Sequence, residues 1–243
     1  MILNDIRTFD IDRVLLKGKP IDELKKSYNK KLITSDKNVL NSVKNKKVDL
    51  KDLCLYLKDA NANVMQVIPG QIITRKAAAQ VKVENGIFIP DKKYAKLAVV
   101  ERHRATGAIG LGIVEGFGIS NGAIGSTVAH DAHNIIAAGD NDEDILLAIE
   151  ELQRAGGGFS VVRGGKIIDT LELPIAGLMS DRKADDVEKK LKNILENALA
   201  LCANKGMDPF MTLSFLSLTA IPEIRLTDKG LYDVDKAEYM GIN

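Results

Sequence analysis

Tryptophan is absent from this sequence, and aromatic residues make up only 5% of its 243 residues, so the hydrophobic core must be aliphatic. Cysteine is scarce as well. Cys54 and Cys202 are too few for a disulfide framework and form no C-x-x-C pair, which favours a reduced, cytoplasmic environment. With only 6 prolines and 45% hydrophobic residues, the chain is neither a disordered segment nor a collagen-like repeat.

An excess of charge of either sign is also missing, since 34 Lys and Arg oppose 33 Asp and Glu. This balance provides no overall field that would attract nucleic acid or an anionic membrane surface. No hydrophobic run approaches the length that spans a bilayer. No stretch of roughly 7–15 apolar residues follows a basic start, so the sequence shows no signal peptide. We therefore expect neither a nucleic-acid partner nor a membrane partner.

The first part of the chain is polar and divides into two segments. Residues 1–20 contain a strand pattern and a turn pattern at Lys17-Gly18-Lys19-Pro20, and an isolated hairpin is only marginally stable in water. We interpret this segment as the remnant of a small β-domain. Residues 21–62 are rich in Lys, Asn and Asp and are expected to form a polar linker. Because Leu50, Leu53 and Leu57 lie at helical spacing, the linker is predicted to contain a short amphipathic helix at 49–59.

The remaining residues, 63–243, are expected to form one α+β domain. Apolar runs separated by glycine-rich turns precede the long helical patterns, so strands and helices do not alternate strictly. This order favours a mixed, mostly antiparallel sheet layered with helices over a doubly wound sheet. The apolar segment 209–231 is expected in the core. Strands are predicted at 63–69, 71–78, 96–103, 108–118, 122–130 and 134–140, hairpins at 79–90 and 159–173, and helices at 142–154 and 184–203.

The histidines gather in one short part of the sequence. His103, His130 and His133 are the only three, and two of them belong to the segment His130-Asp131-Ala132-His133-Asn134 after an apolar strand. Two imidazoles, a carboxylate and an amide are able to hold a metal, relay a proton or hydrogen-bond a polar heterocycle. The alternative is a loop in which Asp131 and Asn134 satisfy backbone groups. Both interpretations stay open, with His130, Asp131 and His133 as catalytic candidates.

Three further residues are candidates for substrate binding. Asn134 ends the histidine segment, and its amide offers both a donor and an acceptor. Arg102 and His103 follow another predicted strand, where polar side chains either line a site or simply meet solvent.

Several segments together resemble one known family. They are VIPGQIITR, AVVERHRATGAIGLGIVEGFG, GAIGSTVAHDAHNIIAAGDNDEDI, LPIAGLMSD, PFMTLSFLSL and IPEIRLTDKGLYDV. In this order they resemble the C-terminal region of the adenine deaminases of the amidohydrolase superfamily, from about residue 64 to residue 234. The early segment FDIDRVLLKGKPI is similar to the last strands of the small β-domain of that family. The family more often has Ser where this sequence has Ala132.

The resemblance implies metal-assisted hydrolysis of adenine to hypoxanthine and ammonia by the whole enzyme. Its manganese or iron lies in a (β/α)₈ barrel that contains an H-x-H pair. This sequence has no H-x-H and no room for a barrel of roughly 250 residues. The resemblance therefore implies a chain without a metal site or cofactor of its own, inactive alone, that supports or caps a barrel in cis or in trans. A homo-oligomer is a further expectation.

The role that we expect for the histidine segment is to reach the mouth of the barrel site and contact the purine. Two alternatives remain open at this point. One is a stand-alone purine-binding or regulatory module without catalysis. The other is a self-sufficient hydrolase built on the three histidines, which requires a metal bound by this chain alone.

Overall fold

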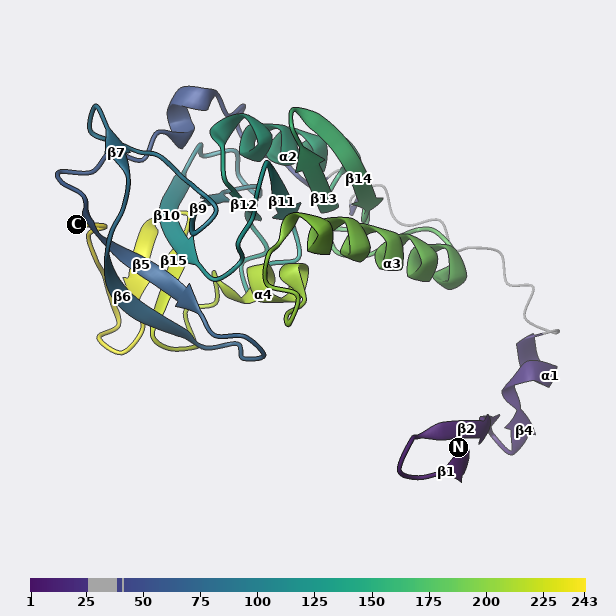
Figure 1. Ribbon diagram of the computed structural model, residues 1–243. Coiled ribbons are helices and arrows are strands. Elements are labelled where there is room, and N and C mark those ends of the chain that lie inside the picture. The colour runs from purple at the N-terminus through teal and green to yellow at the C-terminus, as the bar shows by residue number, and fades with distance from the viewer. Residues whose placement is uncertain (26–38, 41) are drawn as a thin grey trace. The chain divides into compact units, whose positions relative to one another are not determined.

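A computed structural model describes residues 1–25, 39–40 and 42–243, and the chain divides into two compact units, Met1–Thr34 and Ser35–Asn243 (Figure 1). The first unit contains two small antiparallel hairpins and a short helix. The predicted turn over Lys17-Gly18-Lys19-Pro20 is confirmed only for Lys17 and Gly18, because Lys19 and Pro20 belong to β4, which pairs with β3. The elements are β1 (Ile2–Asp5), β2 (Asp10–Arg13), β3 (Leu15–Leu16), β4 (Lys19–Pro20) and α1 (Ile21–Lys25).

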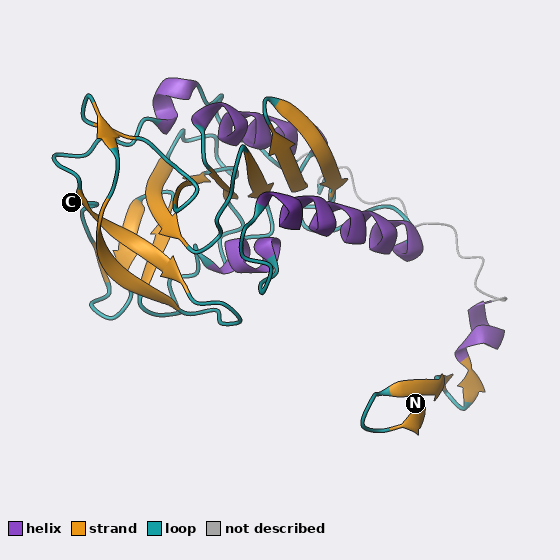
Figure 2. Ribbon diagram, in the orientation of Figure 1, coloured by secondary structure: helices purple, strands orange, loops and turns teal. Residues whose placement is uncertain are grey.

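The second unit is built on an eight-stranded sheet with the order β14-β13-β11-β12-β9-β10-β5-β6. All neighbouring strands are antiparallel except β10 and β5, which pair in parallel at Val114–Met65 and Glu115–Gln66. The expected α+β class with a mixed, mostly antiparallel sheet is confirmed (Figure 2). The strands are β5 (Asn61–Val67), β6 (Thr74–Gln80), β9 (Tyr94–Val100), β10 (Ile109–Glu115), β11 (Gly122–Ser126), β12 (Ile135–Gly139), β13 (Gly158–Arg163) and β14 (Lys166–Glu172).

The other elements cover this sheet or extend from it. The helices are η1 (Leu50–Leu53, a 3₁₀ turn), α2 (Asp142–Ala155), α3 (Ala184–Leu201) and α4 (Pro209–Phe215). A two-stranded hairpin comprises β7 (Val83–Glu84) and β8 (Ile87–Phe88), and a three-stranded sheet comprises β15 (Ile224–Thr227), β16 (Gly230–Asp233) and β17 (Glu238–Tyr239). In the described part of the chain no helix combines the length and the apolar character needed to cross a membrane.

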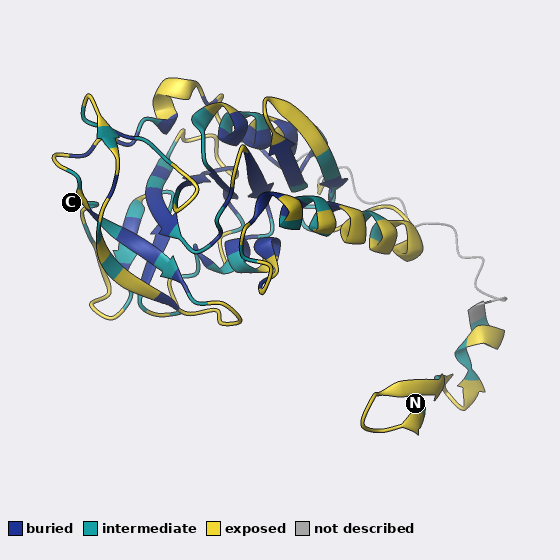
Figure 3. Cartoon of the chain, viewed as in Figure 1, coloured by how far each residue is buried: buried dark blue, intermediate teal, exposed yellow. Residues whose placement is uncertain are grey.

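The sheet is buried on both faces because successive side chains of a strand point to opposite sides. On β9, Ala98 and Val100 pack with α2, whereas Leu97 and Val99 pack with α3, α4 and the small sheet. The central strands are consequently buried along their length, while much of α3 stays exposed (Figure 3). The apolar segment 209–231 contributes α4, β15 and part of β16 to the second of these layers, as the sequence predicted.

The amphipathic helix predicted at residues 49–59 is wrong. Only the 3₁₀ turn η1 forms there, and the chain then runs extended, with Tyr56 bridged to Ile87. Leu53, Leu55 and Leu57 are all buried, so the side chains follow the alternation of an extended chain and not helical spacing. The buried leucines are therefore not the set of Leu50, Leu53 and Leu57 whose spacing suggested a helix.

The segment just before η1 contributes to the core of the second unit. Val43 and Val48 are buried in the hydrophobic cluster beneath α2. The division of the chain at residues 20 and 62 stays a prediction.

Helix α2 begins and ends where the sequence predicted. Asn141 is the N-cap, and its Oδ1 accepts a hydrogen bond from the Asp144 amide at 2.8 Å. At the other end Gly156 has φ 73°, a left-handed conformation that glycine adopts without the steric cost of a Cβ.

A buried ion pair joins α2 to the sheet. The Lys96 side chain is 0% exposed, and its Nζ lies 2.5 Å from Asp142 Oδ1 and 2.7 Å from the carbonyl oxygen of Leu53. Asp142 is the first residue of α2, where the positive end of the helix dipole also favours a carboxylate. One lysine on β9 therefore holds both the start of α2 and η1.

Removal of the carboxylate is expected to destabilise the second unit more than removal of the lysine. Asp142→Ala leaves a buried ammonium group without a counter-charge, and we expect a loss of about 3 kcal/mol in the free energy of unfolding. Lys96→Met fills the same space without a charge and is expected to cost about 1 kcal/mol or less. Urea unfolding followed by circular dichroism measures both values. Equal losses for the two variants would contradict this interpretation.

Candidate functional site

The candidate residues are brought together by the pairing of β9 with β12. These strands are antiparallel neighbours, with Val100 opposite Ile135. The residues that follow β9 therefore lie beside the residues that precede β12. As a result, Arg102 and His103 meet the loop of residues 130–134, which we call the histidine loop.

The Arg102 side chain holds the histidine loop in place through hydrogen bonds. Its side chain is buried, with the residue only 1% exposed, and it donates from Nε to the carbonyl oxygen of His133 and from Nη2 to that of Ala176 at 3.0 Å. Nη1 donates to Ser42 Oγ at 3.3 Å, and the Arg102 amide faces Asn134 Oδ1 at 3.4 Å. Burial lowers the pKa of Arg102. These contacts indicate a positioning role, and substrate binding by Arg102 stays a prediction.

Glu101 organises the turn that carries His103. Its carboxylate accepts hydrogen bonds from the amides of His103 (2.5 Å), Arg104 (2.8 Å) and Thr106 (2.9 Å), and from Thr106 Oγ1 (3.0 Å). Burial raises the pKa of Glu101, but these bonds outweigh it and lower the pKa to about 2. Glu101 was not among the site residues predicted from the sequence. An acidic residue directly after a buried strand and close to a threonine was the available signal.

The histidine loop also rests on α4 and the turn after it. The His130 amide donates to the carbonyl oxygen of Ser214 at 3.0 Å, and Ser217 Oγ donates to the carbonyl oxygen of His130 at 3.1 Å. The His130 ring packs on the Phe215 ring, with centroids 4.9 Å apart. The loop is therefore held from α4 as well as from Arg102.

The structure brings all three histidines to this loop. His103 Nε2 lies 2.7 Å from the carbonyl oxygen of Ala132, and the rings of His130 and His133 meet edge to face with centroids 5.7 Å apart. Nδ1 of His133 is buried and has no hydrogen-bond partner in the described part of the chain. Burial, followed by the charges on His130 and Arg102, lowers the pKa of His133 below its ordinary 6.5, against a smaller opposite effect of Asp131. His133 is therefore a neutral imidazole at physiological pH.

A cavity of about 430 Å³ lies beside the histidine loop. Of the six candidate residues, Asp131 and Asn134 line it. The turn after α4, the β15–β16 hairpin and β17 complete the wall, with Tyr232 and Tyr239 as its aromatic side chains. Neither tyrosine was a candidate in the sequence, because nothing in the local pattern places residues 232 and 239 beside residues 131–134.

Comparison with known proteins identifies the family. Residues 71–238 match the family model described as the adenine deaminase C-terminal domain. The chain belongs to that family. It is 44% identical over 236 residues to adenine deaminase 2 of Carboxydothermus hydrogenoformans. This alignment covers 96% of this chain and 41% of the relative. It is also 43% identical to an adenine deaminase of Clostridium acetobutylicum, covering 99% of this chain and 43% of the relative.

The match to adenine deaminases confirms the resemblance seen in the sequence. A third relative, an adenine deaminase of Halalkalibacterium halodurans, is 46% identical over 205 residues, or 83% of this chain and 35% of the relative. The chain thus spans about two fifths of the length of the first two relatives.

Within residues 1–25, 39–40 and 42–243, no three His, Cys, Asp or Glu side chains of this adenine deaminase C-terminal chain are grouped so that they would hold a metal ion.

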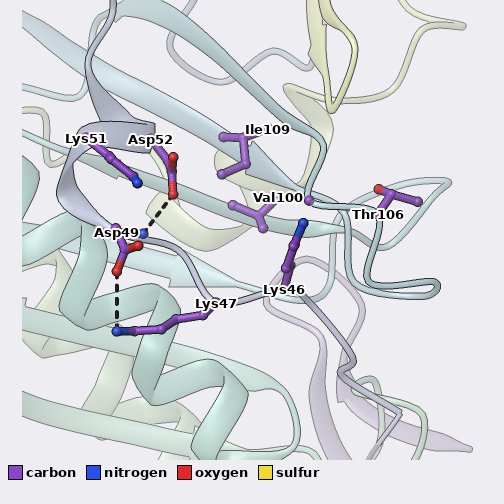
Figure 4. Close-up of a pocket in the computed structure, with 9 residues that line it drawn as sticks. Lys46, Lys47, Asp49, Lys51, Asp52, Val100, Thr106 and Ile109 are labelled. Carbon is purple, nitrogen blue, oxygen red and sulfur yellow. Dashed lines mark hydrogen bonds and ion pairs between the residues drawn. The ribbon is translucent and has the colours of Figure 1, made fainter.

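A second cavity, of about 440 Å³, has a different character (Figure 4). Lys46, Lys47 and Lys51 line it together with Asp49 and Asp52. Lys47 Nζ lies 3.3 Å from Asp49 Oδ1, and the Asp49 amide donates to Asp52 Oδ2 at 2.9 Å. The charges of this cavity therefore partly neutralise one another, and it lacks the tyrosine wall of the first cavity.

The two cavities open on opposite sides of the sheet. Val99 lines the cavity beside the histidine loop, and Val100 lines the lysine cavity. Consecutive residues of a strand point to opposite faces, so the end of β9 separates the two cavities.

Glu101 is expected to contribute stability through its hydrogen bonds. Glu101→Gln replaces a charged acceptor by a neutral one, and we expect a loss of about 2 kcal/mol at neutral pH. Because the folded pKa is lowered, the contribution is present above the ordinary value of 4.5 and is lost as the pH falls through about 2. Denaturant unfolding from pH 7 to pH 2, with Glu150→Gln on the exposed face of α2 as the control, measures this difference. A variant as stable as wild type at pH 7 would contradict it.

His133 is expected to make the domain sensitive to mild acid. Because its folded pKa lies below 6.5, the unfolded chain binds the proton first, and stability falls as the pH drops below 6.5. His133 has φ 52°, a conformation that asparagine tolerates, so His133→Asn removes the titration without a new backbone conflict. Melting temperatures between pH 7.5 and pH 5 are expected to fall less steeply in this variant. The same slope in wild type and His133→Asn would refute this prediction.

Proposed function

We propose that this chain is the C-terminal portion of an adenine deaminase, which converts adenine and water to hypoxanthine and ammonia. The catalytic barrel lies outside this chain and is supplied in cis or in trans. The observation that carries the proposal is the match over residues 71–238, together with near-complete coverage of this chain by adenine deaminases of more than twice its length.

In this proposal the histidine loop supports or caps the active site of the barrel. The loop presents His130, Asp131, His133 and Asn134, whose imidazole, carboxylate and amide groups suit the ring nitrogens and the amino group of a purine. Arg102 and α4 hold the loop from two sides, so its polar groups are positioned before a partner or substrate arrives. A neutral His133 is able to accept a proton without first losing one.

The metal, the location and the assembly are part of the same proposal. Manganese or iron in the barrel supplies a metal-activated water when it is bound. We further propose a cytoplasmic enzyme of adenine catabolism and purine salvage, and an assembly in which the barrel portion and a second copy of this chain take part. Low cysteine content supports the reduced compartment.

Reconstitution tests the proposal. The purified chain, the unmatched portion of the Clostridium acetobutylicum relative and their mixture are assayed for hypoxanthine with added Mn²⁺. We expect conversion in the mixture and none by the chain alone. Conversion by the chain alone would refute the proposal and favour a hydrolase on His103, His130 and His133. The absence of hypoxanthine from all three samples would favour a binding module, for which the tyrosine-lined cavity is the supporting observation.

The histidine loop is tested by a double substitution in the reconstituted enzyme. His130→Ala with His133→Ala is expected to lower turnover at least about tenfold in samples that circular dichroism shows to be folded, because the groups that contact the purine are lost. The control is Glu188→Ala with Lys192→Ala, two exposed residues of α3. Full activity of the histidine variant would rule out the proposed role of the loop.

A further inference from the structure

We propose that the cavity between the histidine loop and the β15–β16 hairpin is a binding site for a neutral purine base, with adenine preferred over hypoxanthine. The choice of a purine rests on the proposed function. The position of the site and the class of ligand, a planar heterocycle without a phosphate, rest on the groups that line the cavity.

Two tyrosines provide an aromatic wall. Tyr232 on β16 and Tyr239 on β17 are directly opposite each other in the small sheet, and their rings meet edge to face with centroids 5.2 Å apart. In this arrangement the edge of one ring points at the face of the other, so neither face of the first ring is covered by its partner. A planar base stacks on such a face, and stacking on tyrosine is a common way of holding a nucleobase.

Asn134 supplies hydrogen bonds at the other side of the cavity. It is buried, and its Oδ1 already faces the Arg102 amide, so the orientation of the amide is set. Its Nδ2 has no hydrogen-bond partner in the described part of the chain, while the residue lines the cavity. An asparagine amide pairs with the amino group and the neighbouring ring nitrogen of adenine through both of its atoms.

The charges of the lining select among purines. Asp131 and Asp228 contribute two carboxylates, against the single ammonium group of Lys229. A negative lining disfavours a nucleotide phosphate. A carboxylate only accepts hydrogen bonds, so it suits the amino group of adenine and opposes the carbonyl oxygen that replaces it in hypoxanthine.

The size of the cavity and the apolar part of its lining agree with this ligand. A volume of about 430 Å³ lies within the usual range of small-molecule sites, roughly 300–1,000 Å³. Val99 and Leu218 provide apolar surface between the polar groups.

Binding of adenine, hypoxanthine and AMP to the purified chain tests the inference by equilibrium dialysis and titration calorimetry. We expect saturable binding of one adenine per chain, weaker binding of hypoxanthine and no comparable binding of AMP. Tyr239→Ala is expected to weaken adenine binding about tenfold by loss of a stacking surface. Tyr56→Ala is the matched control, since Tyr56 is 68% exposed and Tyr239 is 51% exposed, so both variants are expected to fold.

A second variant tests the selectivity. Asp131→Asn replaces an acceptor by a group that also donates, so the preference for adenine over hypoxanthine is expected to shrink by about fivefold. Asp131 is exposed, and the substitution keeps its size.

Three results would overturn the inference: no adenine binding, AMP binding as tight as adenine binding, or equal affinity of Tyr239→Ala and Tyr56→Ala. The deaminase proposal is judged separately by hypoxanthine formation in the reconstituted mixture. If the reconstituted mixture converts adenine but the isolated chain does not bind adenine, this site is refuted and the deaminase proposal stands.

Discussion

The antiparallel pairing of β9 with β12 is the constraint on which the site depends. With Val100 opposite Ile135, the end of one strand meets the start of the other. Arg102 then lies under the histidine loop and donates to its backbone and to the carbonyl oxygen of Ala176. A buried guanidinium is costly unless its donors are satisfied, so these contacts fix the loop and Arg102 at the same time.

The layer formed by α4 and the small sheet converts this fixed loop into a site. Backbone and side-chain bonds from Ser214 and Ser217 hold His130, and the β15–β16 hairpin closes the cavity that Asp131 and Asn134 line. On the opposite side of the same strand end, the lysine cavity has neither an aromatic wall nor this loop (Figure 4). The two faces of β9 therefore present different chemistry from consecutive residues.

Most of the fold of the second unit was predictable from local signals. Apolar runs between glycine-rich turns predicted the strands, the Asn85-Gly86 turn joins β7 to β8 as expected, and Asn141 and Gly156 bound α2. The exception was the segment of Leu53, Leu55 and Leu57, where leucines satisfy helical and extended spacing at once. Its docking beside β8 decides the outcome, and no local pattern reveals that contact.

The site was predictable only in part, for a related reason. The histidine loop was visible because its polar residues are consecutive, and Arg102 and His103 were visible at the end of a strand. Glu101, Tyr232 and Tyr239 were not, because their roles arise from hydrogen bonds and packing that the tertiary structure creates. The family was inferred from the resemblance of several sequence segments, whereas the cavity is created by tertiary packing that no local pattern reveals.

Hydrogen–deuterium exchange in the reconstituted complex is the most direct test of the claim that the histidine loop serves the adenine site. The amides of residues 131–134 and 216–219 are measured with and without a non-reactive adenine analogue. The account predicts slower exchange in both segments and no change in α2. Unchanged exchange in both segments, in a complex that binds the analogue and converts adenine, would contradict it.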